Sequence, residues 1–414
     1  MKTLLLPLLV LLCLSAQGQP PIALDDYCAA VDAHSRQLKI AAARRDAASE
    51  ELGRARTGRL PRLTLEGNFT ATVRSVSGAR RWTFDLGPQL VQTLYGGGAV
   101  RAAIDQAGLD CDAARHDELF TQGEVRYAAE YAYWNLSAMT LYVASMHEYV
   151  ELIRSLKRVV DRRFEEGYIA KGDVLMIDTR LIEAEYRLAN AEQRAAVALH
   201  DFNVLRGEDP IAEVALAATI RDSMGMPGRV AFDETLARRS DYAAARLRSE
   251  RAEAGVRSAV APFNPQLNVG AGAAWQPFTP NFSGKTYVDG VAFVQLSVPI
   301  FHGGERRRAE AAARAAQRRS EWVAEQLRDD IRREESDGWT ALVQSLARVE
   351  VSRRNLRLAG ENLSLSTYSY NEGLASILDV MQAQLSWIQL YTNDIEACFD
   401  RAVAVSDYRR ITVQ

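Results

Sequence analysis

The sequence predicts a mainly helical chain that also carries transmembrane β-strands. Three observations predict this class: the second half of the chain repeats motifs of the first, long proline-free segments fill most of each copy, and short alternating segments interrupt them. Each copy has the order helix, β-hairpin, very long helix, helix. The alternating segments are long enough to cross a bilayer as tilted strands.

The duplication is visible in motifs that recur at one constant spacing of 206 residues. Such internal self-similarity marks a repeated structural unit. The matched segments are Leu94-Tyr95-Gly96-Gly97 with Ile300-Phe301-His302-Gly303, Phe164-Glu165-Glu166-Gly167 with Tyr370-Asn371-Glu372-Gly373, and Asp173-Val174-Leu175 with Asp379-Val380-Met381. Upstream, Pro61 matches Pro265 at a spacing of 204 residues.

The predicted organisation has four parts. Residues 1–18 have the short apolar core and small-residue end of a secretory signal peptide, with cleavage expected after Gly18 or after Ala16. The first repeat covers 19–206, with a β-hairpin at 61–95 and coiled-coil helices at 99–206. A linker covers 207–229, and the second repeat covers 230–414, with a hairpin at 265–301 and coiled-coil helices at 305–410.

The predicted strands have one apolar and one polar face. In the first strand Leu63, Leu65 and Phe69 alternate with polar residues such as Glu66 and Asn68. Four strands cannot close a barrel; eight from two chains would enclose only side chains, whereas twelve from three chains leave a lumen. We therefore expect a trimeric 12-stranded β-barrel joined to a periplasmic α-helical barrel.

The helical segments predict long rods. Residues 99–166 and 305–372 contain no proline, and each would form a helix of roughly 100 Å. The segment 173–206 carries apolar residues at alternating three- and four-residue steps, which is typical of coiled-coil packing. The first helix is expected to run unbroken from Leu24 to Gly58, where helix-breaking residues follow.

Composition and motifs exclude several classes of function. The formal net charge is −3 and no basic tail is present, so we expect no nucleic-acid partner. The five histidines lie far apart, and no zinc, phosphate-loop or nucleophile motif is present. We therefore expect no catalytic site, no metal site and no cofactor, and hence no enzyme. Cys28, Cys111 and Cys398 are expected to be reduced, with a Cys28–Cys398 bridge as the alternative.

The chain resembles TolC-like outer-membrane efflux proteins. Three repeated motifs carry this resemblance in combination: the strand-to-helix turns, the turns around Gly167 and Gly373 (the tip turns), and the Asp-Val-Leu/Met that follows each tip turn. The resemblance covers essentially the full mature length. It implies a homotrimer in outer-membrane lipid with a long periplasmic portion, joined through a periplasmic adaptor protein to an inner-membrane transporter of the RND or ABC type. The implied function is a passive exit duct; the transported substrate is not readable from the sequence.

The resemblance also implies a periplasmic gate at the helix ends farthest from the strands. Asp379 matches the family's gating aspartate, and Asp173 and Tyr370 match groups that hold neighbouring coiled coils closed. Two positions depart from the family pattern, because Gln382 replaces a second aspartate and Ala375 replaces a basic latch.

A simpler interpretation of the two aspartates stays open. Asp173 and Asp379 both open helices, where a carboxylate stabilises the helix N-terminus by ~0.3–1 kcal/mol. Ser376 also stands three residues before Asp379, the spacing of a capping box.

The exposed tip turns are the expected docking surface for the adaptor. This surface comprises Phe164, Glu165, Gly167, Glu372 and Gly373, with the rings of Phe164 and Tyr370 expected to pack rather than dock. The rival to an exit duct is a structural trimeric coiled-coil surface protein anchored in the outer membrane. A soluble periplasmic enzyme is a more distant alternative.

Overall fold

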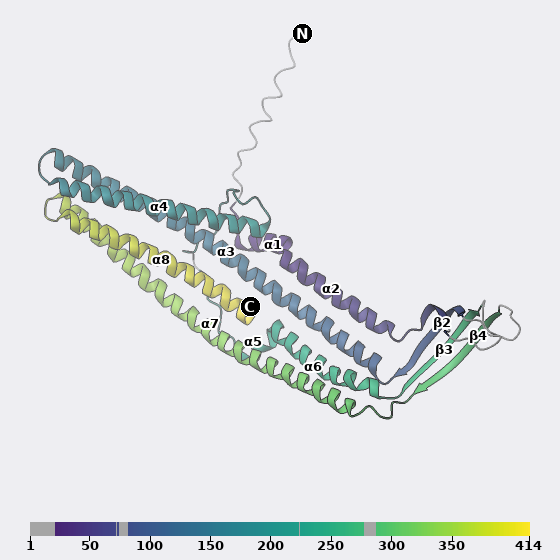
Figure 1. The fold of residues 1–414 in the computed structure, drawn as a ribbon. Coiled ribbons are helices and arrows are strands. Elements are labelled where there is room, and N and C mark those ends of the chain that lie inside the picture. The colour runs from purple at the N-terminus through teal and green to yellow at the C-terminus, as the bar shows by residue number, and fades with distance from the viewer. Residues whose placement is uncertain (1–20, 72, 74–81, 223, 277–286) are drawn as a thin grey trace, which may run out of the picture. The chain divides into compact units, whose positions relative to one another are not determined.

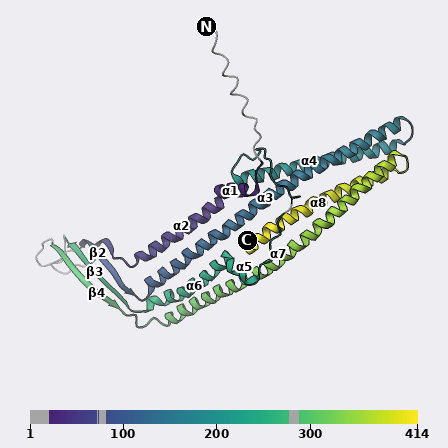
Figure 2. The same cartoon turned by 180° about the vertical axis from the view of Figure 1, so that it is seen from behind.

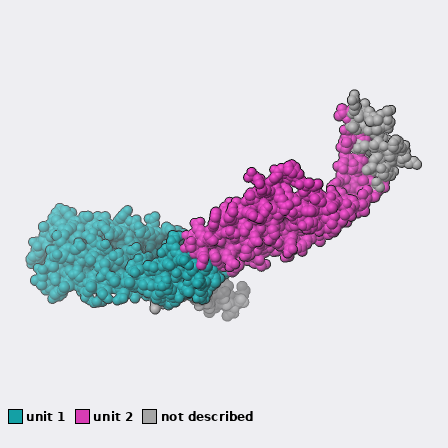
Figure 3. All heavy atoms as spheres, turned by 90° about the horizontal axis from the view of Figure 1, so that it is seen from below, with its two compact units in different colours: residues 1–39, 121–238, 331–414 teal, residues 40–120, 239–330 magenta. Residues whose placement is uncertain are grey.

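The computed structural model describes residues 21–71, 73, 82–222, 224–276 and 287–414 (Figure 1). The predicted signal peptide and part of each predicted hairpin, 61–95 and 265–301, lie outside these residues. The chain divides into two compact units (Figure 3). Unit 1 comprises Met1–Lys39, Thr121–Arg238 and Ile331–Gln414, and unit 2 comprises Ile40–Phe120 and Arg239–Asp330. Each unit therefore draws on both sequence repeats, whose boundaries remain a prediction about the duplication.

The predicted order of elements is confirmed in both halves of the chain. The two longest helices have 67 residues each and the two that follow them have 36 each. The first half contains α1 (Leu24–His34), α2 (Arg36–Thr57), β1 (Arg62–Ala71), β2 (Trp82–Gly96), α3 (Ala99–Glu165) and α4 (Lys171–Arg206). The second half contains α5 (Phe232–Arg238), α6 (Ser240–Val260), a 3₁₀ turn (Ala261–Phe263), β3 (Gln266–Gln276), β4 (Tyr287–Ser297), α7 (Glu305–Asn371) and α8 (Ile377–Thr412).

The first helix of each half is broken, and the expectation of one continuous helix from Leu24 to Gly58 is wrong. The backbone leaves the helical region at Ser35, whose Oγ accepts a hydrogen bond from the backbone N–H of Leu38 at 3.3 Å. A serine that caps the next helix in this way favours a new helix start over continuation. The second half breaks at Arg239, 204 residues later, so the interruption belongs to the repeat itself.

Unit 2 contains a four-stranded antiparallel sheet in the order β1-β2-β3-β4 (Figures 1 and 2). Its register places apolar residues opposite one another, because directly paired residues share a face of an antiparallel sheet. The pairs on this face include Leu63↔Leu90, Phe69↔Phe84, Leu86↔Trp275, Trp275↔Val288 and Val269↔Val294. The outcome is one apolar face that continues across all four strands.

The turn between β2 and α3 explains the glycines that follow Tyr95. Gly97 has φ of 64°, and a Cβ there would lie 2.2 Å from the carbonyl oxygen of Ala261. The Asn264 side chain donates a hydrogen bond to the carbonyl of Gly97 at 2.8 Å. The segment is therefore a tight backbone junction, as predicted, and glycine is needed because no side chain fits.

Unit 1 has a coiled-coil core. Ile177, Ala184, Ala191 and Ala198 recur every seven residues along α4 and are all buried. This spacing confirms the predicted coiled-coil pattern. At the α1 side of the core, the Tyr27 ring stacks on Phe202 with centroids 3.9 Å apart.

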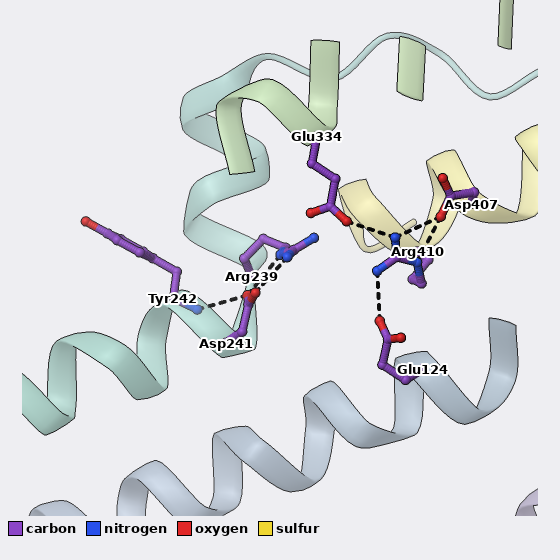
Figure 4. Close-up of polar contacts among 7 residues, drawn as sticks. All are labelled: Glu124, Arg239, Asp241, Tyr242, Glu334, Asp407 and Arg410. Atoms are coloured by element: carbon purple, nitrogen blue, oxygen red, sulfur yellow. Dashed lines mark hydrogen bonds and ion pairs between the residues drawn. The ribbon is translucent and has the colours of Figure 1, made fainter. Parts of the chain in front are cut away.

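An ion-pair cluster ties α3, α7 and α8 together within unit 1 (Figure 4). Arg410 donates hydrogen bonds of 2.8 Å to Glu124, Glu334 and Asp407. Burial disfavours the charge of Arg410, but the hydrogen bonds that it donates to the carboxylates more than offset burial and raise its pKa. Such charge-assisted bonds fix the relative position of the three helices within this unit.

Within the described part of the chain, no helix combines the length and the apolar character needed to cross a membrane. Cys28, Cys111 and Cys398 are buried and free. Burial is the main cause that raises the pKa of the Cys28 thiol, to about 12. The prediction of three reduced cysteines is therefore confirmed, and the alternative bridge between Cys28 and Cys398 is absent.

The Tyr27 contacts predict two distinct stability losses. The hydroxyl donates to the carbonyl of Phe202 at 3.0 Å, so Tyr27→Phe should cost about 0.5–1.5 kcal/mol of unfolding free energy. Tyr27→Ala also removes the stacked ring and should cost about 3–5 kcal/mol. Thermal unfolding followed by circular dichroism measures both. Equal losses for the two variants would show that the stacked ring contributes nothing.

Candidate functional site

The two tip turns, where α3 turns into α4 and α7 turns into α8, have the same backbone geometry. In the first, the N–H groups of Gly167 and Tyr168 donate to the carbonyls of Phe164 and Arg163. The second turn repeats this pattern, with Gly373 N–H to Tyr370 O at 3.0 Å and Leu374 N–H to Ser369 O at 2.8 Å. Both glycines have positive φ, 81° and 77°. These are paired Schellman motifs, in which glycine ends the helix at low conformational cost.

Arg163 links the two turns. Its Nη2 donates to the carbonyls of Tyr370 and Asn371, both at 2.9 Å, and its guanidinium lies 4.5 Å from the Tyr370 ring centroid. The last carbonyls of a helix lack intrahelical partners and carry the negative end of the helix dipole, so a cation is favoured there. Arg163 of the first repeat thus caps the long helix of the second.

Tyr370 is the buried member of this contact. It is 3% exposed, and its hydroxyl has no hydrogen-bond partner among the described residues. Burial is the main cause that raises its pKa, and nearby Asp173 acts in the same direction while Arg163 opposes them. Asp173 is half-buried in the first turn of α4, but no hydrogen bond joins its side chain to Tyr370 in the described residues. The direct partner of Tyr370 is therefore Arg163.

Asp379 forms a capping box with Ser376. The Ser376 Oγ accepts from the N–H of Asp379 at 3.3 Å, while Asp379 Oδ2 accepts from the Ser376 N–H at 2.9 Å and from its hydroxyl at 2.7 Å. The hydroxyl bond is the main cause that lowers the pKa of Asp379. The carboxylate and Gln382, one helical turn further on, are both exposed. The capping role is thus present, and it leaves the charge of Asp379 accessible.

The equivalent position in the first repeat is built differently. The residue that precedes α4 is Ala170, which stands 206 residues before Ser376 and supplies no side-chain cap. Asp173 therefore shares the helix-start position of Asp379 but not its hydrogen bonds. The two tips therefore share the Schellman motif that ends each long helix, α3 and α7. They differ in the cap that begins the following helix, α4 or α8.

The predicted docking residues all lie at the surface. Phe164, Glu165, Gly167, Glu372 and Gly373 are exposed, so the expectation that the Phe164 ring packs is not met within a single chain. Tyr168 and Leu374, at matching places in the two turns, are 77% and 80% exposed. Each of these two residues directly follows the turn glycine, a position that the sequence shows. The apolar residue at this position of a Schellman motif usually packs against its own helix, but here both side chains are exposed.

The sheet of unit 2 carries a hollow of mixed character on the face opposite its apolar one. This cavity of about 260 Å³ is lined by polar residues of β1 and β2, among them Glu66, Asn68 and Asp85, and by apolar residues of β4, Val291 and Phe293. Asn68 donates to the Asp85 carboxylate at 2.9 Å across the β1–β2 pair. Across the residues that the structure describes, no group of three or more His, Cys, Asp or Glu side chains is arranged to hold a metal ion.

The chain matches the model of the family described as "Outer membrane efflux protein" over residues 30–207 and 231–402. It is 26% identical over 371 residues to protein CyaE of Bordetella pertussis, covering 86% of this chain and 76% of that protein. It is 29% identical over 227 residues to the fusaric acid resistance protein FusA of Burkholderia cepacia, covering 53% of this chain and 42% of FusA. The chain thus matches less than half the length of that relative.

The fold is that of a solved outer-membrane channel. The CmeC outer membrane channel of Campylobacter jejuni matches with a TM-score of 0.84 at 15% identity, covering 94% of this chain and 85% of that one. At this identity the likeness establishes the fold, and the family match covers both sequence repeats. The chain therefore belongs to the outer membrane efflux protein family.

Proposed function

We propose that three copies of this chain form an exit duct through the outer membrane. Their sheets would combine into a 12-stranded barrel and their helices into a periplasmic tunnel. An inner-membrane transporter of the RND or ABC type would hand over cargo through a periplasmic adaptor protein. The duct is passive, because transport along it requires no chemistry from the chain.

The observation that carries this proposal is the open sheet of unit 2. Its apolar face spans four strands, with Leu63, Leu65, Phe69, Val288 and Val294 exposed, while β1 and β2 place polar residues on the opposite face. β1 and β4 each have one neighbour within the described sheet. An unpaired strand edge in lipid costs several kcal/mol per unsatisfied group, so the edges require strands from other chains.

Exposed apolar seams on unit 1 support assembly through the helices as well. On α7, Val351, Leu358 and Leu365 recur at seven-residue steps and are all exposed. On α4, Leu175 and Ile182 show the same spacing on a side distinct from the buried seam. Seams of this period pack against helices of a neighbouring coiled coil, which supports a trimer of equivalent chains.

The tip turns are the proposed gate and adaptor-docking surface. Asp379 and Gln382 are exposed on α8, and threefold symmetry would place three copies of each around the axis. Tyr370 and Asp173 stand behind them, with Arg163 holding the turns together. The exposed turns around Phe164, Glu165, Gly167, Glu372 and Gly373 would receive the adaptor.

Conductance tests the proposed function. Purified protein inserted into a planar bilayer should give discrete ion-conducting events, and its mass in detergent should be that of a trimer. The rival surface stalk would be trimeric but would give no conductance. A monomer that needs no detergent would contradict both assignments.

The Arg163 contact predicts a looser gate when it is removed. Arg163→Ala deletes two charge-assisted hydrogen bonds, each worth about 1.5–3 kcal/mol, so the open state should gain roughly tenfold or more. Arg163→Lys should be intermediate, because an ammonium donates to carbonyls but lacks the planar face that stacks on Tyr370. Single-channel open probability is the measurement.

Arg162→Ala is the matched control for this experiment. Arg162 is exposed in the same helical turn, so it shares the dipole interaction of Arg163 without a side-chain bond to the second turn in the described residues. Equal open probabilities for Arg162→Ala and Arg163→Ala would rule out the proposed link.

The Asp379 hydrogen bonds predict a pH-dependent cation effect. A ring of carboxylates attracts cations, so Asp379→Asn should lower the cation preference of the trimer. In Ser376→Ala the pKa of Asp379 should rise towards its ordinary value, because the main hydrogen bond that lowers it is lost. The cation preference should then fade at a higher pH than in the unmodified trimer. Reversal potentials across a salt gradient measure it; an unchanged pH midpoint would contradict the coupling.

A further inference from the structure

In unit 2, helices join strands at one end of the sheet. The register places Gly96 of β2 opposite Gln266 of β3, and Gln266 opposite Ser297 of β4, so these strand ends lie at one level. The ends of α2 and the starts of α3 and α7 lie at the same end of the sheet in both views (Figures 1 and 2). We call this region the junction.

The junction is rich in arginine and poor in acid. The segments 54–62, 97–104, 258–265 and 298–308 contain one acidic residue, Glu305. Seven arginines of these segments are exposed and form no ion pair within the described part of the chain. Six of them, which we call the arginine collar, are Arg56, Arg59, Arg101, Arg306, Arg307 and Arg308; the seventh, Arg62, begins β1.

Arginines deeper in the helical part of unit 2 are different, because acidic residues face them. Arg251 pairs with Asp110 at 3.1 Å, Arg257 with Asp105 at 2.9 Å, and Arg45 with Glu118 at 3.0 Å. The pairs join α2 to α3 and α3 to α6. The chain therefore neutralises its interhelical arginines and leaves those of the collar without a counter-charge.

Exposed apolar residues stand directly on the strand side of the collar. Ile300 is 93% and Phe301 86% exposed, and Leu60 and Tyr95 are also exposed. Apolar and aromatic side chains followed by cations are the order found where a protein leaves the hydrocarbon of a bilayer and enters its headgroups. The apolar face of the sheet therefore fixes the depth at which the collar stands.

We propose that the arginine collar binds the phosphate groups of anionic phospholipids in the leaflet nearest the helices. This inference rests on the proposed function, which places the helices in the periplasm and the strands in the outer membrane. A guanidinium grips phosphate through two parallel hydrogen bonds, and each basic residue near an anionic surface strengthens binding by roughly fivefold.

The collar reaches lipid whichever way α7 is turned in the assembly. Arg306, Arg307 and Arg308 are consecutive, so their side chains are spread over about 200° of the helix. At least one of the three is then directed away from the lumen. Arg59, in the connection from α2 to β1, and Arg101, in the first turn of α3, add further charge, which suits a surface of many headgroups better than one small ligand.

Lipid retention by the purified full-length trimer tests the proposal. The trimer is equilibrated in mixed micelles with equal phosphatidylglycerol and phosphatidylcholine, purified again, and its retained lipids are quantified. We expect at least a tenfold excess of phosphatidylglycerol, reduced by 0.5 M NaCl because screening weakens exposed charge pairs. The collar variant Arg56→Gln, Arg59→Gln, Arg101→Gln, Arg306→Gln, Arg307→Gln, Arg308→Gln should retain the two lipids in nearly equal amounts.

The matched control changes two exposed arginines of the same helix, Arg318→Gln and Arg319→Gln. From Arg308 to Arg318 the helix rises by about 15 Å, beyond the screening length of about 8–10 Å. This control should keep the excess. Inorganic phosphate alone should not displace phosphatidylglycerol at millimolar concentration; displacement would show a free-anion site and overturn the proposal.

Two further outcomes separate this inference from the proposed function. A trimer that conducts but shows no lipid preference, or a collar variant that keeps the full preference, overturns the collar alone. A collar variant that keeps its lipids but no longer binds an adaptor would assign the arginines to a protein partner and also overturn it. If the unmodified protein gave no conductance, the proposed function, on which the collar inference rests, would be overturned.

Discussion

The structure depends on one constraint, which is that every backbone N–H and C=O of a strand in lipid must have a hydrogen-bond partner. Within the sheet of unit 2, neighbouring strands pair their backbone groups with one another. The outer strands β1 and β4 have only one described neighbour each, so one edge of each has no strand partner in the described sheet. Their apolar face then determines where the sheet can stand, because Leu63 and Phe69 are exposed in the single chain. Assembly is therefore a condition for the sheet to exist in a membrane.

The duplication gives each feature twice, and the differences between the copies come either from one substituted residue or from a tertiary contact. The paired Schellman turns and the breaks at Ser35 and Arg239 recur because they follow from local backbone chemistry. The capping box at Ser376 has no counterpart at Ala170, and Arg163 contacts the other copy. One sequence change at a helix start is enough to make two equivalent tips unequal.

Local pattern predicted most of the fold from sequence. Alternation placed Leu63 and Leu65 on one face, heptad spacing placed Ala184 and Ala191 in a seam, and turn glycines located both tips. The sequence did not predict the helix break at Ser35, because a serine within a helix-favouring segment is compatible with a continuous helix. Only the hydrogen bond that its side chain accepts in the structure identifies it as a cap. The sequence did not predict the Arg163 contact for another reason. Its partners lie more than 200 residues away in the chain, and no local sequence pattern indicates that they are close in space.

The tip also explains how the chain can lack two groups expected from the family pattern. Ala375 carries no charge and Gln382 no carboxylate, so neither can form an ionic latch. Arg163 supplies a cation from the opposite turn, and the partners it binds are backbone carbonyls, which titrate at no pH. Any motion that parts the turns must break these bonds and bring water to the Tyr370 ring, which is otherwise covered. Within the single chain the two turns are thus joined by a helix cap and a buried aromatic ring, while the carboxylate of Asp379 stays exposed.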